Sequence, residues 1–213
     1  MRFEEVRDIL RGRVVFKSKE FELSHRRLSL WCKSGKLVRL SKGVYRLGGE
    51  VAYDRFELAA LLSPRSYVTS WSALEYHRLL IKPYEGPICS ALEGRAFQKE
   101  IEGTSYRFKG VGPCKLRRIL SIPDCGFRVA DPLTAILDLC HRREPPIHRF
   151  TPVRFDEFDP EELRLRLFEA TERSQRRAIG RLLALSRLRR RQGPGVERHL
   201  LAGSPIFSPD ENP

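Results

Sequence analysis

The sequence predicts an α+β protein, in which helices and short strands occupy largely separate stretches of the chain. Near both ends, apolar residues recur every three or four positions, which is typical of helices that pack on one face. The middle of the chain instead holds short β-prone runs separated by Gly and Pro. We therefore expect a helical N-terminal module with a small hairpin, then a mixed α/β domain with a small, mostly antiparallel sheet and C-terminal helices.

Two short helices and a β-prone run are expected at the start of the chain. Residues 3–11 place apolar side chains on one helical face and charges on the other, and Gly12 ends this helix. Residues 14–16 form a short β-prone run. Ser18 can cap a second short helix over residues 18–23, since glutamates near its first turn complement the helix dipole.

A third helix is predicted over residues 25–34. Ser24 is a preferred N-cap residue, and Gly35 is the residue type that commonly follows the end of a helix. Leu28 and Trp31 lie three positions apart, so both are expected to face inward. The polar and basic residues of this helix then fall on its more exposed faces.

A β-hairpin is expected directly after the third helix. Residues 36–40 and 44–47 are β-prone, and residues 41–43 between them supply a glycine for the turn. Three helices followed by a two-stranded hairpin is the order of a winged helix-turn-helix, so we assign residues 1–47 to such a domain. Its third helix would enter the major groove of DNA, with the hairpin along the phosphate backbone.

The distribution of charge favours a nucleic-acid partner. The formal net charge of +13 divides into +8 over residues 1–47, +1 over residues 48–159, +6 over residues 160–199 and −2 in the tail. Clustered Lys and Arg gain free energy by releasing counterions from phosphates. The two basic ends of the chain therefore suggest a polyanionic partner.

The predicted DNA contacts lie on the third helix and the hairpin. Arg26 and Arg27 can reach either guanine edges or phosphates, and Lys42 in the hairpin turn is expected near phosphate. The full predicted set is Ser24, His25, Arg26, Arg27, Ser29, Lys33, Lys36, Arg39, Lys42 and Arg46.

Residues 51–200 are predicted to form the second, α+β domain, joined to the first by a hinge at Gly48-Gly49. Helices are expected over residues 53–62 and 67–80. A further helix begins at Asp131-Pro132, because Asp is a favoured cap and Pro a favoured first residue. The β-prone stretches between these helices are residues 87–92, 105–111, 116–122 and 126–129.

The C-terminal region contains two more predicted helices. The first begins at Asp159-Pro160, which is followed by two glutamates near the positive end of the helix dipole. The second spans about residues 174–191, and residues 201–213 are expected to form a loosely ordered tail. This second helix is either a solvated amphipathic helix or a basic surface for DNA backbone, RNA or an acidic partner. Its arginines, with one that directly precedes it, are Arg173, Arg176, Arg177, Arg181, Arg187, Arg189, Arg190 and Arg191.

The sequence disfavours a membrane protein, a metal site and an enzyme. No apolar run approaches the ~18 residues of a membrane span, and residues 1–5 do not resemble a secretory signal, so we expect a cytoplasmic protein. The five cysteines form no C-x-x-C pair, which favours reduced thiols. Asp138, His141 and His148 lack further ligands at metal-binding spacing. With no phosphate-binding Gly-rich loop, G-x-S-x-G or H-E-x-x-H, we expect no catalytic residues, metal or cofactor.

Four segments resemble the AbiEi family of antitoxins and transcriptional regulators, in the order and spacing of that family. Residues 37–47 resemble its wing, which closes on glycine-valine-tyrosine. Residues 63–77 resemble its helix with tryptophan-serine-alanine-leucine and a later tyrosine-histidine. Residues 127–138 resemble its strand-to-helix junction, and residues 177–183 are similar to a helix near its C-terminus. The match covers most of residues 14–190.

The resemblance implies a function. In an AbiEi-like protein the N-terminal domain binds inverted repeats in the promoter of its own operon and represses it. The C-terminal domain carries the antitoxin activity of a type IV toxin–antitoxin system, which counters a nucleotidyltransferase-like toxin without a stable complex. We therefore expect a repressor that binds double-stranded DNA and also acts as an antitoxin.

Two alternatives remain open from the sequence. One is an RNA-associated or protein-binding module whose main contact is the Arg-rich C-terminal helix. The other is a metal-dependent nuclease, because Glu93, Glu100 and Glu102 lie near Lys99 and Lys109 in a β-rich stretch. These acids fall in the polar connection between predicted strands, which favours solvated side chains over a metal site.

Overall fold

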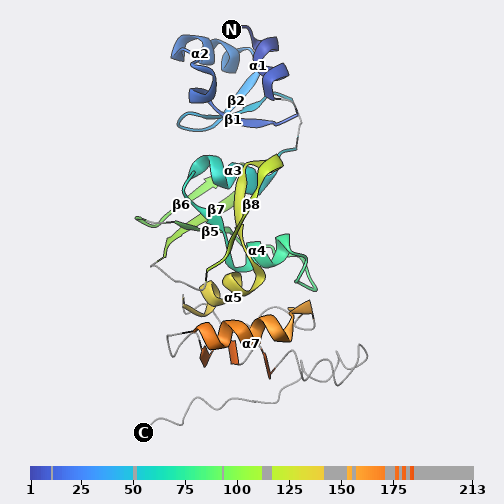
Figure 1. The fold of residues 1–213 in the computed structure, drawn as a ribbon. Helices are drawn as coiled ribbons and strands as arrows, with labels where there is room; N and C mark the ends of the chain where they lie inside the picture. Colours follow the sequence, from blue (N-terminus) through green and yellow to red (C-terminus); the bar gives the residue numbers. More distant parts are fainter. Residues whose placement is uncertain are drawn as a thin grey trace. The chain divides into compact units, whose positions relative to one another are not determined.

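The computed structural model describes residues 1–10, 12–49, 52–92, 94–111, 117–141, 153–154, 157–170, 176–177, 179–180 and 183–184. The chain divides into two compact units, Met1–Pro152 and Val153–Pro213. The described residues combine helices with two sheets, which confirms the predicted α+β class (Figure 1).

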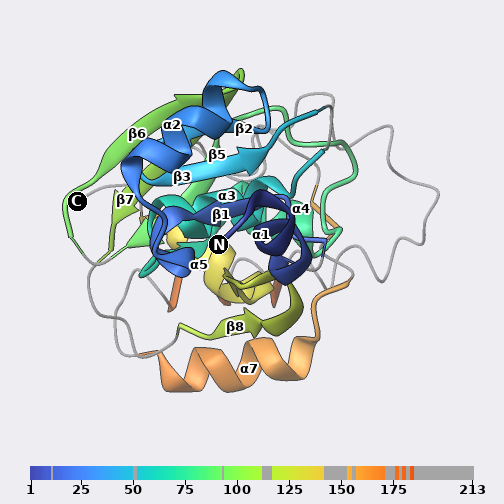
Figure 2. The same cartoon turned by 90° about the horizontal axis from the view of Figure 1, so that it is seen from above.

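The N-terminal part of the first unit is a three-stranded sheet with helices packed on it (blue in Figures 1 and 2). Strand β3 lies in the middle, and β1 and β2 pair with it in antiparallel register on either side. The elements follow the order α1 (Phe3–Leu10), β1 (Val15–Lys17), η1 (Ser18–Phe21), α2 (His25–Lys33), β2 (Leu37–Ser41) and β3 (Val44–Leu47).

This part has its own hydrophobic core, to which both α-helices, the η1 turn and all three strands contribute. The ring of Phe16 on β1 meets Phe21 edge-on at 5.3 Å and stacks on Tyr45 of β3 at 6.1 Å. Aromatic side chains bury much apolar surface, and such pairs add a geometric preference to that burial. The buried core residues are Val6, Leu10, Phe16, Phe21, Leu28, Leu37 and Tyr45.

Local sequence signals explain where these elements begin and end. The Ser24 hydroxyl accepts a hydrogen bond from the Arg27 backbone N–H at 3.4 Å, so it caps α2 as predicted. Gly43 adopts φ +74° in the turn between β2 and β3, a conformation that favours glycine. The predicted helix over residues 18–23 is instead one short 3-10 turn, which Glu22 ends in a left-handed conformation.

Gly48, where the chain leaves the N-terminal part, packs closely against the end of α2. Its backbone N–H donates to the Lys36 carbonyl at 2.7 Å. A Cβ atom at this position would lie 1.8 Å from the Gly35 carbonyl oxygen, so only glycine fits. Gly48 is therefore a packed position, a role that the predicted hinge at Gly48-Gly49 did not assign to it.

The rest of the first unit is built around a six-stranded mixed sheet. Neighbouring strands follow the order β6-β7-β5-β4-β9-β8, with antiparallel pairs β4–β5, β6–β7 and β8–β9 and parallel pairs β4–β9 and β5–β7. The sheet is thus mostly antiparallel. Its strands are β4 (Tyr67–Val68), β5 (Ile88–Leu92), β6 (Phe97–Ile101), β7 (Thr104–Gly110), β8 (Ile119–Ile122) and β9 (Phe127–Ala130).

Helices cover both faces at the centre of this sheet. Every residue of β5 is buried, and successive side chains of a strand point to opposite faces, so both faces must be covered there. Helix α3 packs against β4, β5 and β9, whereas α4 packs against β5 and α5. The helical segments are α3 (Arg55–Leu62), α4 (Ser70–Tyr76), the turn η2 (Pro123–Cys125) and α5 (Pro132–His141).

Two strands of this sheet differ from the sequence prediction. Tyr67 and Val68 form β4 between β5 and β9, so the helix predicted over residues 67–80 begins only at Ser70. Strand β6 was not predicted at all. Its sequence FQKEI is polar and its residues are mostly exposed, because β6 is an edge strand paired only with β7.

In the second unit, the structure describes one long helix, α7 (Pro160–Glu169), which begins at the predicted place. The Asp159 carboxylate accepts from the Glu161 backbone N–H at 3.0 Å, and Pro160 is the first helical residue. Most of the predicted helix over residues 174–191 and the whole predicted tail over residues 201–213 lie outside the described residues.

Candidate nucleic-acid interface

One face of α2 presents an exposed stripe along the helix. Arg26, Leu30 and Lys33 follow the spacing i, i+4, i+7, with Ser29 beside them, and Leu30 is 57% exposed. Leu28 lies on the opposite face and is buried in the core. Helix α2 is therefore held by one face and leaves a basic face free for a partner.

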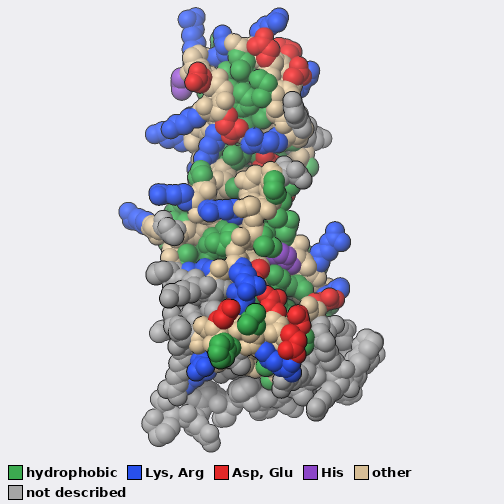
Figure 3. Space-filling model, in the orientation of Figure 1, with side chains coloured by type: hydrophobic (Ala, Val, Ile, Leu, Met, Phe, Trp, Pro, Cys, Tyr) green, Lys and Arg blue, Asp and Glu red, His purple; other side chains and the backbone are tan. Residues whose placement is uncertain are grey.

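Three predicted cations on this surface are available for contact with a partner. Arg26, Lys33 and Lys42 are exposed, and none forms an ion pair or hydrogen bond with the part of the chain that the structure describes. His25, at the start of α2, is exposed in the same way. A phosphate that binds these cations does not have to displace an internal carboxylate. Lys and Arg side chains project from the N-terminal part of the chain, at the top of Figure 3.

Two other predicted contacts hold the N-terminal part together. The Ser24 hydroxyl is occupied as the cap of α2. The Arg27 guanidinium donates from Nη1 to the Met1 carbonyl oxygen at 2.7 Å, which ties the start of the chain to α2. Both side chains thus have a structural role within the N-terminal part.

The predicted contacts Lys36, directly before β2, and Arg39, on β2, also have partners within the protein, though weaker ones. Lys36 lies with its Nζ 3.8 Å from a carboxylate oxygen of Glu4 and 5.2 Å from the centre of the Phe3 ring. The Arg39 Nε donates to the Ser41 carbonyl at 3.3 Å, across a register shift in β2. Exposed pairs of this kind stabilise by at most about 1 kcal/mol, so a phosphate can compete for both side chains.

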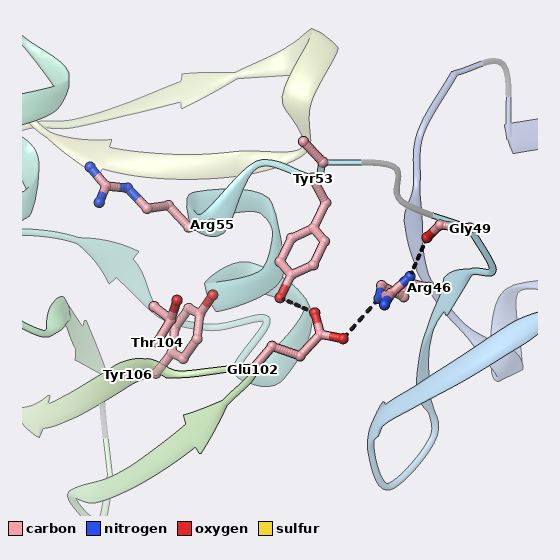
Figure 4. Close-up of a pocket in the computed structure, with 8 residues that line it drawn as sticks. Arg46, Gly49, Tyr53, Arg55, Glu102, Thr104 and Tyr106 are labelled. Atoms are coloured by element: carbon pink, nitrogen blue, oxygen red, sulfur yellow. Dashed lines mark hydrogen bonds and ion pairs between the residues drawn. The ribbon is translucent and has the colours of Figure 1, made fainter.

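Arg46, the last predicted contact, points toward the larger sheet. Its Nε donates to Glu102 at 2.9 Å, and its Nη1 donates to the carbonyls of Leu47 and Gly49 at 3.1 and 2.9 Å (Figure 4). The other carboxylate oxygen of Glu102 accepts from the Tyr53 hydroxyl at 2.9 Å. The structure therefore places Arg46 in an internal contact, apart from the exposed cations of α2.

Sequence reasoning overlooked two lysines at the η1 turn. The Ser18 backbone N–H donates to the Gly43 carbonyl at 3.0 Å, which holds the start of η1 beside the turn that carries Lys42. Lys19 is exposed without a partner among the described residues, and partial burial lowers the pKa of Lys17. The two lysines at positions 17 and 19 were visible in the sequence as a local basic segment. Their position next to the hairpin, however, depends on the pairing of β1 with β3.

Further contacts join the N-terminal part to the rest of the first unit. Arg13 donates from Nε to Glu57 of α3 at 2.9 Å and lies 3.2 Å from Glu20. Burial raises the pKa of the Glu57 carboxyl above its ordinary value, although the Arg13 guanidinium opposes that shift. On the other side, the Lys99 ammonium of β6 donates to the Ser41 hydroxyl. The Lys99–Ser41 and Arg46–Glu102 contacts fix the hairpin β2–β3 next to the hairpin β6–β7.

No protein-family model and no curated protein matches this chain. The resemblance to AbiEi proteins therefore depends only on the four segments quoted above. Among the helices of the described residues, none has the length and apolar character that a membrane span requires.

The acidic residues considered for a nuclease do not converge in the structure. Glu100 is exposed on β6, while Glu102 lies in the β6–β7 turn and pairs with Arg46; Glu93 is outside the described residues. Within the described ranges, no three His, Cys, Asp or Glu side chains gather as a metal site would need.

Asp138, considered for a metal, is a buried acceptor of hydrogen bonds. One of its oxygens accepts from the hydroxyls of Tyr67 and Thr69 at 3.0 and 2.6 Å, and the other accepts from the Arg117 Nε at 3.1 Å. A buried carboxylate with three donors joins β4 to α5 and meets its hydrogen-bonding needs within the protein.

The predicted second basic surface is largely outside the described residues. Arg176 and Arg177 are helical and exposed. The remaining members of that set, for which the structure describes nothing, are Arg173, Arg181, Arg187, Arg189, Arg190 and Arg191.

Proposed function

We propose that residues 1–47 form a winged helix-turn-helix domain that binds double-stranded DNA. The observation that carries this proposal is the exposed stripe of α2, whose cations have no partner among the described residues. The element order and the sheet order β1-β3-β2 support it, because α2 follows α1 and the 3-10 turn η1 and lies directly before the hairpin β2–β3.

In this proposal α2 enters the major groove and the β2–β3 turn lies along the backbone. Arg26 is in the first turn of α2, where residues of a recognition helix come nearest to base edges. Lys42 lies in the hairpin turn and Lys19 in the neighbouring η1, where they suit phosphate contacts that position the domain without reading sequence. Leu30 gives the stripe an apolar centre, which suits contact with a thymine methyl group.

We further propose that the chain represses its own operon and acts as the antitoxin of a type IV toxin–antitoxin system. The four AbiEi-like segments support this, and the DNA target is then an inverted repeat in the operon's promoter. Two copies would each occupy one half-site, with the spacing set by the helical repeat of DNA. The partner in function is a nucleotidyltransferase-like toxin, countered without a stable complex.

The first experiment measures binding of the full chain to a labelled duplex of its own promoter and to a shuffled duplex. Arg26→Ala should weaken binding to the promoter by about 10-fold, as expected when a charged groove contact of about 1–3 kcal/mol is lost. Arg65→Ala is the matched control, because Arg65 is exposed on the loop before β4 and has no partner among the described residues. Equal affinity of the wild-type chain for both duplexes would exclude sequence-specific binding.

The second experiment tests the antitoxin proposal separately. A nucleotidyltransferase-like gene that adjoins the gene for this chain is expressed with and without the chain, and cell growth is followed. The wild-type chain should restore growth, and Arg26→Ala should restore it equally while losing repression of a promoter reporter. If neither protein restores growth while repression by the wild type is intact, the chain is a repressor without antitoxin activity.

A further inference from the structure

A cavity of about 510 Å³ lies between β3, the start of α3 and the hairpin β6–β7 (Figure 4). This volume is within the range of small-molecule sites. None of the DNA contacts proposed above lines it, and Arg46, a DNA contact predicted from the sequence, is held there by Glu102. The side chains that give the cavity its chemistry are Arg46, Tyr53, Arg55, Glu102, Thr104 and Tyr106.

Tyr106 supplies the most unusual group in this cavity. Its side chain is fully buried, yet its hydroxyl has no hydrogen-bond partner among the described residues. Thr104 lies two positions earlier on β7, so the two side chains share one face of the strand, which Figure 4 shows. A buried hydroxyl normally has a partner, and its absence within the protein points to one from outside.

The polar groups of the cavity that still lack a hydrogen-bond partner among the described residues are donors. Burial raises the pKa of the Tyr106 hydroxyl, which therefore remains a proton donor. Arg46 uses Nε and Nη1 in bonds to protein atoms, but its Nη2 and the Thr104 hydroxyl have no partner in the described part of the chain. Arg55 bonds Glu75 through one nitrogen only.

The acceptors of the cavity are already occupied. One oxygen of Glu102 accepts from Arg46 and the other from Tyr53. Burial and the neighbouring Glu102 carboxylate raise the pKa of Tyr53 to about 12, so this donor stays protonated too. Arg46 is paired with Glu102 and Arg55 with Glu75, so the groups of the cavity that still lack a partner in the described ranges are donors. A ligand must therefore bring acceptors, which phosphate and carboxylate oxygens supply.

We propose that this cavity binds a small organic anion, either a phosphate monoester or a carboxylate, which accepts hydrogen bonds from Tyr106, Thr104 and Arg46. The site stands apart from the proposed stripe on α2 and does not depend on DNA binding. Because the Tyr106 hydroxyl is covered in the structure, the ligand moves a neighbouring side chain to reach it.

The test measures the melting temperature of the full chain without DNA, at matched ionic strength. The probes are adenosine 5′-monophosphate for the phosphate arm and citrate for the carboxylate arm, with adenosine as the uncharged control. At about 100 times its dissociation constant, a bound probe should raise the melting temperature by roughly 5 °C or more. An anion that binds only to the exposed cations of the surface would also raise the melting temperature. The control variant must therefore change the cavity and keep every surface charge.

Tyr106→Phe is that variant, since it removes one hydroxyl and changes no charge. Its melting temperature without probe should equal or exceed that of the wild type, because it removes a buried donor that has no protein partner. The shift caused by the charged probe should fall by at least half. If Tyr106→Phe does not fold, Thr104→Val provides the same comparison from the neighbouring hydroxyl.

Three results would overturn the proposal. The first is the absence of any shift with either anion at about 10 mM, where even a weak millimolar site would be filled. The second is an equal shift in the wild type and the hydroxyl variant, which would assign the effect to surface cations. The third is an equal shift with adenosine, which would remove the requirement for an anion.

Discussion

The replacement of Lys42 by alanine provides the sharpest quantitative test of the proposed interface. Lys42 is exposed in the turn between β2 and β3 and has no partner among the described residues, so its loss should leave the fold intact. The proposed interface contains four such cations, of which Arg26 is assigned to base edges and Lys19, Lys33 and Lys42 to phosphates. Each phosphate contact contributes about −0.9 to the slope of log affinity against log salt concentration.

The expected numbers follow from this count for one chain on one half-site. With three phosphate contacts the slope is about −2.7, so affinity should fall about 40-fold between ~50 and ~200 mM salt. Without Lys42 the slope becomes about −1.8, and the same change in salt should lower affinity only about 12-fold. The affinity of the variant should fall by a similar factor for promoter and shuffled duplexes, because a phosphate contact carries no sequence information.

Fluorescence anisotropy with a half-site duplex at four or more salt concentrations measures both slopes. Lys82→Ala is the matched control, because Lys82 is an exposed lysine with no partner in the described ranges and lies after α4. An unchanged slope in Lys42→Ala would refute the placement of the hairpin on the phosphate backbone. An equal reduction in Lys82→Ala would show that the slope reports total charge instead of contact.

Three further predictions concern the stability of the first unit. Ser24→Ala should lower the free energy of unfolding by about 1 kcal/mol in urea denaturation, because the N–H that Ser24 caps loses its acceptor, whereas Ser24→Asp should restore it. A double-mutant cycle of Arg46→Met and Glu102→Gln should give a coupling of about 0.5–1 kcal/mol, since the pair is only partly buried, and strict additivity would contradict the contact. Burial raises the pKa of Glu57 above 4.5, so the folded state holds this proton more tightly than the unfolded state. The free energy of unfolding should therefore decline as pH rises through that pKa, and Glu57→Gln should remove this part of the decline; a difference between wild type and variant that is independent of pH would argue against it.

The N-terminal elements could be predicted from the sequence because their signals are local. Ser24 lies directly before the helix it caps, and Gly43 lies in the turn that requires its positive φ. The apolar side chains of α1 and α2 are spaced so that one face of each helix reaches the core. Such signals act over a few residues, so they could be read without knowledge of the tertiary structure.

The elements and contacts that prediction missed depend on residues far apart in the chain. Strand β6 has a polar sequence, and its pairing with β7 decides its conformation. Arg46 and Glu102 are 56 positions apart, so no spacing rule separates Arg46 from the exposed cations of α2. The Tyr106 hydroxyl could not be singled out either, because its lack of a partner is defined only by the folded surroundings.

The close approach at Gly48 also determines how this protein can be engineered. Since a Cβ there would overlap the Gly35 carbonyl, the chain is already anchored to the end of α2 when it reaches Gly49. Extra residues inserted directly after Gly49 would lengthen the connection without disturbing that anchor, whereas an insertion between Leu47 and Gly48 would shift Gly48 away from the Gly35 carbonyl on which it packs. Insertions of increasing length after Gly49 could therefore lengthen the connection between the two sheets stepwise, while the packing of α2 is unchanged.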